Sequence, residues 1–317
     1  MRRLSARGFT LTELMIGMML SAFMIGGVVS VYVSNKQTSR AHSVLAQMQQ
    51  ASQISFQLFN YDMQHAGYSG CANMIASRVV NVLNPVAGVQ PWWRRWNGGL
   101  QGYEAGAVPT FGDGIPAVAG TDGVQVMYGR GNSTSVVAHN VAASPPLTVN
   151  SNNGVIRAGD ILLGCDSKMA VIFQATAVAG AVISHGVGAG TPGNASLNFG
   201  FGANGVNFQQ SLNPDGGTVI PLESVGWYIG ADGASTSLYR VSLWNNSMRT
   251  EKVLENVSNM QLTYLVANAA SYVNASAITN WEDVVAIKIV LTMAQPTGVE
   301  VAANLRTQSM VVNLRNH

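Results

Sequence analysis

The chain has 317 residues, of which 47% are hydrophobic and only 10% are charged, and its formal net charge is +2 at pH 7. A charge this small and scattered excludes the basic surface by which proteins bind nucleic acids. So few charges, together with 34 glycines, are unusual for a cytosolic enzyme and favour an extracytoplasmic assembly protein. The length allows one large domain or two small ones with a buried core.

The N-terminus places a basic leader before a long apolar run. Three arginines within the first seven residues lead into Gly8, and Glu13 is the only charged side chain from residue 9 to residue 35. The run Leu14–Val33 carries no charge, and about 20 residues at about 1.5 Å each cross a hydrocarbon core of about 30 Å. The pattern predicts a membrane helix, and the arginines predict a cytoplasmic N-terminus.

Two ordinary targeting segments compete with this interpretation. A secretory signal peptide has an apolar core of about 7–15 residues and then a small-residue cleavage site, whereas this run is longer and a polar, helix-favouring stretch follows it. A plain signal anchor explains the length and the arginines but not Glu13, because an unpaired carboxylate in a membrane helix is costly. Glu13 is therefore a functional candidate.

The run at residues 8–20, GFTLTELMIGMML, resembles the class III signal of type IV prepilins. In that family the leader is cut on the cytoplasmic side of the membrane and the new N-terminal residue is methylated. The resemblance implies cleavage after Gly8 and methylation of Phe9. It also implies that Glu13 pairs with the N-terminal amine of a neighbouring subunit, which sets the register of assembly because two charges in lipid are neutralised only when subunits align.

The first helix is predicted to continue to residue 67. Apolar residues recur at three- and four-residue steps between positions 44 and 63, with glutamines between them. No proline interrupts the stretch, and Gly67 is placed to cap its C-terminus. The pair Gly26–Gly27 predicts a bend or local melting. We expect a leader at 1–8, a helix at 9–67 that spans the membrane at 14–33, and a β-rich periplasmic domain at 68–317 with room for two sub-sheets.

Residues 61–71, YDMQHAGYSGC, place an acid, a small-residue turn and a cysteine directly after this helix. This pattern resembles PilW-type minor pilins, and the similarity extends to residues 160–176, DILLGCDSKMAVIFQAT, and to strands near the C-terminus. The resemblance implies an α+β, pilin-like fold, with one long helix packed on a large antiparallel β-rich domain. It implies a protein of the bacterial inner membrane whose partners are the prepilin peptidase, other minor pilins, the major pilin, the inner-membrane assembly platform and a tip adhesin.

Cys71 and Cys165 both lie beyond the membrane run, on the periplasmic side if the N-terminus is cytoplasmic. A disulfide between them is the default state in that compartment. Two free thiols are the alternative, and neither cysteine has the spacing of a metal site.

The rest of the chain is rich in strand-forming residues bounded by turn residues. The predicted strands are 123–128, 155–164, 170–178, 219–229, 237–244, 260–267, 284–293 and 310–314. Residues 180–217 are dominated by glycine, alanine, asparagine and serine, which predicts a long loop.

No catalytic or cofactor motif is supported by the sequence that surrounds it. The run Gly200–Gly205 matches G-x-G-x-x-G, but no helical pattern follows it and Pro214 interrupts the region, so a glycine-rich loop is the better interpretation. The five histidines are dispersed without metal-ligand spacing, and no G-x-S-x-G elbow is present. Aspartates in glycine-rich turns are explained by Asx hydrogen bonds, with an opportunistic calcium site as the alternative. We predict no enzyme, no cofactor and no resident metal.

The most unusual cluster is Trp92, Trp93, Arg94, Arg95 and Trp96. Tryptophan and arginine are enriched in binding hot spots, so the cluster is a candidate surface for another minor pilin or a tip protein. The alternative is a loop whose tryptophans fold back onto the core while the arginines stack over them.

These observations predict a minor pilin that primes assembly of a type IV pilus or sits at its tip. A type II secretion pseudopilin, similar to GspJ, shares the N-terminus and the mechanism but serves protein export. A membrane-tethered periplasmic binding domain or enzyme is the remaining alternative, and it would require a polar pocket with converging carboxylates.

Overall fold

The computed structural model describes residues 10–71, 79–87, 90–112, 114–139, 147–167, 169–188, 190–199, 202–203, 206–207, 216–244, 247–298 and 300–315. The chain forms two compact units, one made of the residues up to Gln50 with Gln295–Arg306, the other of Ala51–Ala294 with Thr307–His317. The boundary therefore falls inside the first helix rather than after residue 67. The reason is that the last turns of the helix belong to the β-rich unit, where Phe59 and Met63 are fully buried.

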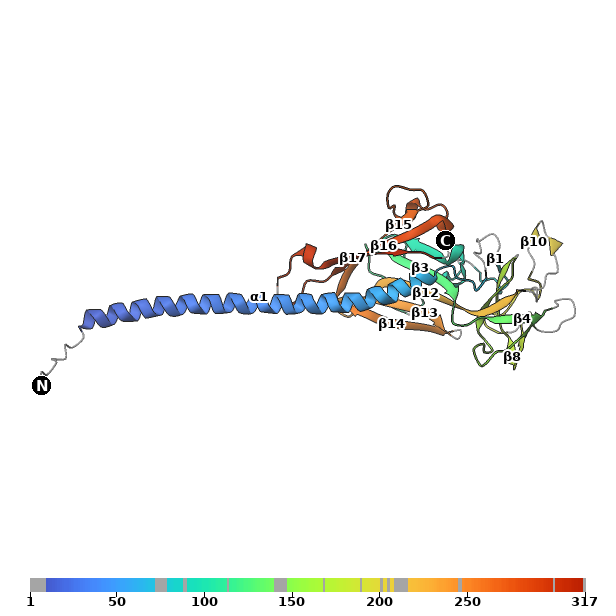
Figure 1. Ribbon diagram of the computed structural model, residues 1–317, viewed down its shortest axis with the longest axis horizontal. Coiled ribbons are helices and arrows are strands. Elements are labelled where there is room, and N and C mark those ends of the chain that lie inside the picture. The colour runs from blue at the N-terminus through green and yellow to red at the C-terminus, as the bar shows by residue number, and fades with distance from the viewer. Residues whose placement is uncertain are drawn as a thin grey trace. The chain divides into compact units, whose positions relative to one another are not determined.

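The helix α1 spans Leu11–His65 as one continuous element (Figure 1). This confirms the long helix predicted from the sequence. The predicted melting at Gly26–Gly27 is wrong, because both glycines are helical; a glycine costs a helix only about 1 kcal/mol, which the surrounding apolar run tolerates. Gly67 has a φ of 74° and ends the helix as predicted.

Strand β12, Thr218–Asp232, is the central strand of the main sheet. Its first residues pair with β6 (Ile161–Cys165) and β4 (Thr134–Ala138). Its later residues lie between β3 (Gly123–Gly129) and β13 (Ser235–Trp244). One long strand therefore connects two groups of strands within a single sheet.

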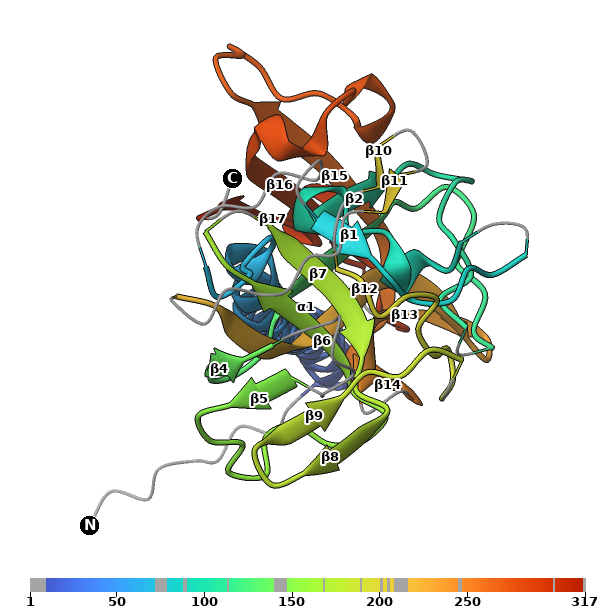
Figure 2. The same cartoon turned by 90° about the vertical axis from the view of Figure 1, so that its right-hand side faces the viewer.

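The remaining strands of the main sheet extend these two groups. They are β1 (Val79–Asn81), β2 (Leu100–Tyr103), β5 (Leu147–Val149), β7 (Ala170–Gln174), β8 (Ala177–Ala179), β9 (Val182–Ser184) and β14 (Ser247–Glu255). Strand β1 runs parallel to β7, and the other described pairs are antiparallel. Figure 2 shows β4, β5, β8 and β9 gathered at one end of the β-rich unit.

A separate sheet contains β15 (Val257–Val266), β16 (Val284–Met293) and β17 (Thr307–Asn313) in that order. Two two-residue strands, β10 (Gly202–Ala203) and β11 (Val206–Asn207), pair with each other. Short 3-10 turns occupy Trp92–Arg94, Asn97–Gly99, Ala275–Ala277, Trp281–Asp283 and Ala303–Leu305.

Most predicted strands are present, two of them with corrected bounds. Eight described strands were not predicted: β1, β2, β4, β5, β9, β10, β11 and β14. Of these, β9, β10 and β11 lie in the stretch 180–217, which was predicted to be a loop. The strand predicted at 155–164 begins only at Ile161, because Asp160 closes a turn by accepting a hydrogen bond from the Arg157 N–H (2.8 Å). The strand predicted at 170–178 is divided into β7 and β8. Strand β14 was missed because its side chains, among them Arg249 and Lys252, are mostly charged or polar, as suits an edge strand.

The end of α1 packs on the central strand through apolar contacts. Phe59 meets Trp227 edge to face, with ring centroids 5.6 Å apart. Directly beyond the helix, the Gly67 N–H donates to the Met127 carbonyl (3.0 Å). A Cβ on Gly99 would lie 2.2 Å from the Gly67 nitrogen, so only glycine permits this close approach.

The predicted disulfide is confirmed between Cys71 and Cys165, with Cα atoms 6.1 Å apart. Cys71 lies just beyond the end of α1, and Cys165 ends β6, whose hairpin with β7 follows the predicted strand, turn and strand. The bond therefore ties the chain after the helix to the main sheet.

We expect reduction of this disulfide, or replacement of both cysteines by serine, to lower the free energy of unfolding by about 2–5 kcal/mol, because the bond closes a loop with a sequence separation of 94 residues. Urea denaturation with and without reductant measures the change. The double-serine variant should not respond to reductant, and a wild-type midpoint that also ignores reductant would contradict the expectation.

Candidate functional site

The first described turn of α1 forms a reciprocal cap. The Thr10 N–H donates to the Glu13 carboxylate (2.9 Å), and the Glu13 N–H donates to the Thr10 hydroxyl (3.3 Å). This is a capping box, and the T-x-x-E spacing before an apolar run was a sequence signal that could have revealed it. Gly8 and Phe9, the predicted cleavage and methylation residues, lie outside the described residues.

The stretch after this cap presents apolar side chains around the whole helix. Side chains from Leu14 to Val33 are exposed in the single chain. By length and composition α1 is able to cross a membrane. A helix that is apolar on every side needs an apolar environment, either lipid or the helices of neighbouring subunits.

At the other end of α1, the carboxylate of Asp62 is buried and receives four hydrogen bonds. Oδ1 accepts from the Tyr128 hydroxyl (2.8 Å) and from Arg240 Nη2 (2.9 Å). Oδ2 accepts from Trp227 Nε1 and from Arg240 Nε, both at 2.8 Å. Four donors match the accepting capacity of a carboxylate, so the buried charge is fully compensated. We call Asp62, Tyr128, Trp227 and Arg240 the Asp62 cluster.

The Asp62 cluster draws on three adjacent strands, since Tyr128 lies on β3, Trp227 on β12 and Arg240 on β13. Asp62 is the acid of the YDMQHAGYSGC pattern, but its partners lie 66 to 178 residues away. Only the register of β12 with its neighbours brings them together, so sequence reasoning missed them.

A second carboxylate extends the cluster toward the surface. Glu223 accepts from Arg240 Nη2 (3.1 Å) and pairs with Arg130 Nε (3.3 Å). Burial raises the pKa of the Glu223 carboxyl, and the positive charges of Arg240 and Arg130 oppose that rise. Burial and the nearby Asp62 charge likewise raise the pKa of Tyr128, so its hydroxyl stays protonated and donates.

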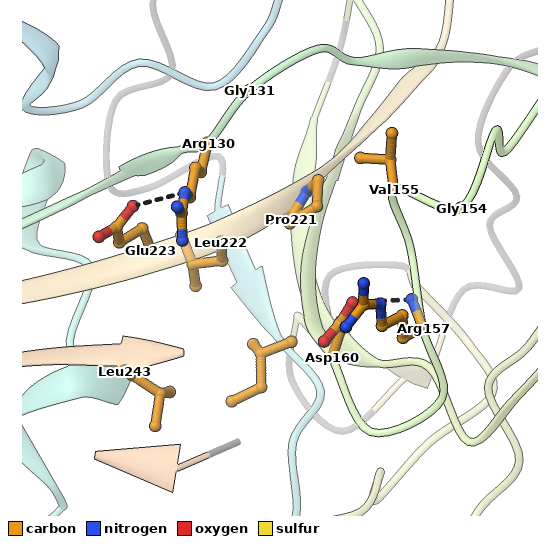
Figure 3. A pocket seen from close by; sticks show the side chains of 11 residues that line it. Arg130, Gly131, Gly154, Val155, Arg157, Asp160, Pro221, Leu222, Glu223 and Leu243 are labelled. Atoms are coloured by element: carbon orange, nitrogen blue, oxygen red, sulfur yellow. Dashed lines mark hydrogen bonds and ion pairs between the residues drawn. The ribbon is translucent and has the colours of Figure 1, made fainter. Parts of the chain in front are cut away.

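A groove of about 270 Å³ opens beside Glu223 (Figure 3). Arg130 and Glu223 lie on one side of it, and Arg157 and Asp160 lie on the other. Burial raises the pKa of Asp160. Between the charged groups the lining is apolar, formed by Val155, Ile161, Pro221, Leu222 and Leu243. The groove can therefore hold a small apolar group between polar walls.

The tryptophan–arginine cluster is not the surface that was predicted. Trp92 and Trp96 are 4% and 6% exposed, and Arg94 is 5% exposed. Trp92 packs edge to face on Phe111 and donates Nε1–H to its carbonyl (3.0 Å). These three side chains belong to the core, which corrects the docking role for them and leaves only Trp93 and Arg95 partly exposed.

The described residues also bring together two histidines that appeared dispersed in the sequence. His139 follows β4 and His185 follows β9, and their Nε2 atoms are 3.0 Å apart. Both are buried, at 7% and 4% exposure, and the Phe199 ring lies 4.7 Å from each imidazole. Burial lowers the pKa of each histidine to about 4, so both are neutral at pH 7.

The aspartates in turns accept hydrogen bonds from backbone N–H groups, locally at Asp166 and from residues 17 and 140 positions away at Asp122. Asp166 accepts from the Met169 N–H (3.0 Å), and Asp122 accepts from the N–H groups of Ala105 and Leu262. Within the described part of the chain, no group of three or more histidine, cysteine, aspartate or glutamate side chains is arranged to hold a metal ion.

Comparisons with known proteins give two family matches. The model of the Prokaryotic N-terminal methylation motif matches residues 3–29, and that of Type IV Pilus-assembly protein W matches residues 226–315. Neither the comparison with curated proteins nor that with solved structures gives a match. The first segment contains Glu13, and the second contains Trp227 and Arg240 of the Asp62 cluster.

Asp62→Asn should lower the free energy of unfolding by about 3 kcal/mol, because it removes the buried negative charge that compensates the partly buried Arg240. Chemical denaturation measures the loss. The control is Glu251→Gln, which removes an exposed ion pair with Arg249 and should cost about 0.5 kcal/mol or less. Equal losses in the two variants would contradict the compensating role.

Stability should fall as the pH is lowered from about 6.5 to about 4, because the unfolded histidines bind protons in that range while buried His139 and His185 do not. Each histidine contributes a slope of about 1.4 kcal/mol per pH unit. Denaturation at several pH values measures it. His185→Gln should reduce the slope, and a slope unaffected by His185→Gln would overturn the assignment.

Proposed function

We propose that this chain, a type IV pilin of the PilW family, is a minor pilin that primes pilus assembly or sits at the pilus tip. The observation that carries the proposal is the combination of a methylation motif, a capped Glu13 and an apolar helix that leads without a break into a large β-rich unit. The role is structural rather than catalytic.

In the proposed mechanism, the prepilin peptidase cuts after Gly8 and the apolar part of α1 holds the processed subunit in the inner membrane. On assembly, the exposed side chains from Leu14 to Val33 exchange lipid for neighbouring helices. The periplasmic part, residues 68–317, is bulky for a densely packed shaft, which supports a place at or near the tip. Other pilins and the assembly platform are the partners.

Glu13 has two separable roles in this mechanism. In the single chain its carboxylate accepts from the Thr10 N–H, a role that glutamine fills equally well in a capping box. In the assembled pilus we propose that the same carboxylate turns to the N-terminal amine of a neighbouring subunit, which requires its negative charge. Glutamine and alanine therefore test different roles at this position.

We expect Glu13→Gln to insert into the membrane and be processed normally but to be lost from sheared pili as completely as Glu13→Ala. Immunoblots of membrane and pilus fractions measure this, and intact mass checks that each mature chain starts at methylated Phe9. Ser21→Ala, further along the helix, is the matched control and should assemble. Normal incorporation of Glu13→Gln would show that capping alone matters.

A deletion strain distinguishes the pilus from a secretion system with the same mechanism. Loss of surface pili with intact protein export supports the minor pilin, whereas the reverse outcome supports a type II secretion pseudopilin.

A further inference from the structure

The paired imidazoles of His139 and His185 point their Nε2 edges at each other. Their ring centroids are 5.1 Å apart and their Nε2 atoms 3.0 Å apart. The two distances differ by 2.1 Å, which is close to twice the distance from the centre of an imidazole ring to its Nε2 atom. The two nitrogens therefore lie nearly on the line that joins the ring centroids. A hydrogen atom shared along this line accounts for the contact in the single chain.

The surroundings of the pair are apolar and aromatic. Phe199 contacts both imidazoles, and Phe173 lies 5.7 Å from His185 and 4.9 Å from Phe199. The Nδ1 atom of His185 is buried without a hydrogen-bond partner among the described residues. Two neutral imidazoles in such a setting are good ligands for a transition metal.

We propose that His139 and His185 bind one soft monovalent ion, Cu(I) or Ag(I), in a nearly linear two-coordinate site. The ion replaces the shared hydrogen, and the donor ring moves its hydrogen from Nε2 to its own Nδ1, so the pair loses no proton. The ring of Phe199, which lies tilted against both imidazoles, offsets part of the cost of the buried positive charge.

The geometry favours a two-coordinate ion over zinc. A linear site needs the Nε2 atoms roughly 4 Å apart, twice a metal–nitrogen bond of about 2 Å. To admit the ion, the Nε2 atoms must move apart by about 1 Å from their separation of 3.0 Å, through rotation of the two side chains. A tetrahedral zinc site needs two more ligands, and among the described residues no third histidine, cysteine, aspartate or glutamate joins the pair.

The full chain in detergent, labelled with ¹⁵N at histidine, tests the proposal directly. On titration with silver nitrate, the Nε2 signals of His139 and His185 should shift together and saturate at one equivalent. The other three histidines should not shift. Both cysteines are in the disulfide, so thiols do not compete for silver. Exposed methionine thioethers can bind silver, but they give no ¹⁵N-histidine signal, so only binding at the pair shifts these two signals. Silver that leaves these two signals unchanged would overturn the proposal.

Variants and a second metal complete the test. His139→Gln and His185→Gln should each abolish one-to-one binding of Cu(I) measured against a chromophoric chelator, whereas His65→Gln should bind as the wild type does. Circular dichroism confirms that the variants are folded, and the wild-type silver titration stands if they are not. Retained binding in either variant, or one-to-one binding of Zn(II) as tight as that of Cu(I), would refute a linear two-histidine site.

Discussion

The structure depends on the compensation of one buried carboxylate. Asp62 is 1% exposed, and a charge so placed is tolerated only when donors surround it. Tyr128, Trp227 and Arg240 supply these donors from β3, β12 and β13. The three strands must therefore hold one register for the last turn of α1 to dock. The cluster makes the end of the helix and the main sheet a single cooperative element, which would suit the proposed role of a subunit held by its helix.

The sequence predicted those features of the fold that depend on residues close together in the chain. The length of α1, the cap at Gly67 and the bounds of β16 follow from apolar periodicity and turn residues, which act within a few positions. The disulfide followed from the compartment that the N-terminus implies. The Asp62 cluster and the paired histidines were not predictable in this way, because Arg240 is 178 residues from Asp62 and His185 is 46 from His139. Only strand register brings such residues together.

The residue types of the tryptophan–arginine cluster predicted a docking surface, and this prediction was wrong for the three buried members. The same residue types that make binding hot spots also make aromatic cores. Burial decides between the two, and Trp92 is buried in a cluster with Phe111 and with Tyr228 and Tyr239 of the main sheet. Strand β14 shows the opposite case, since its charged side chains suggested no strand but are what an edge strand needs to resist unwanted pairing. In both segments, the position relative to the main sheet determined the role of side chains whose types were ambiguous.

The two family matches include residues that act at both ends of α1: the capped first turn, and two of the partners of Asp62, which lies in the last turns. Residues 3–29 hold the capped Glu13, and residues 226–315 hold the Arg240 and Trp227 that bind Asp62. The stretch between the matches, residues 30–225, carries most of the groove beside Glu223 and both paired histidines. Both paired histidines and most of the groove therefore lie outside the two family matches, so features particular to this chain are to be sought in residues 30–225.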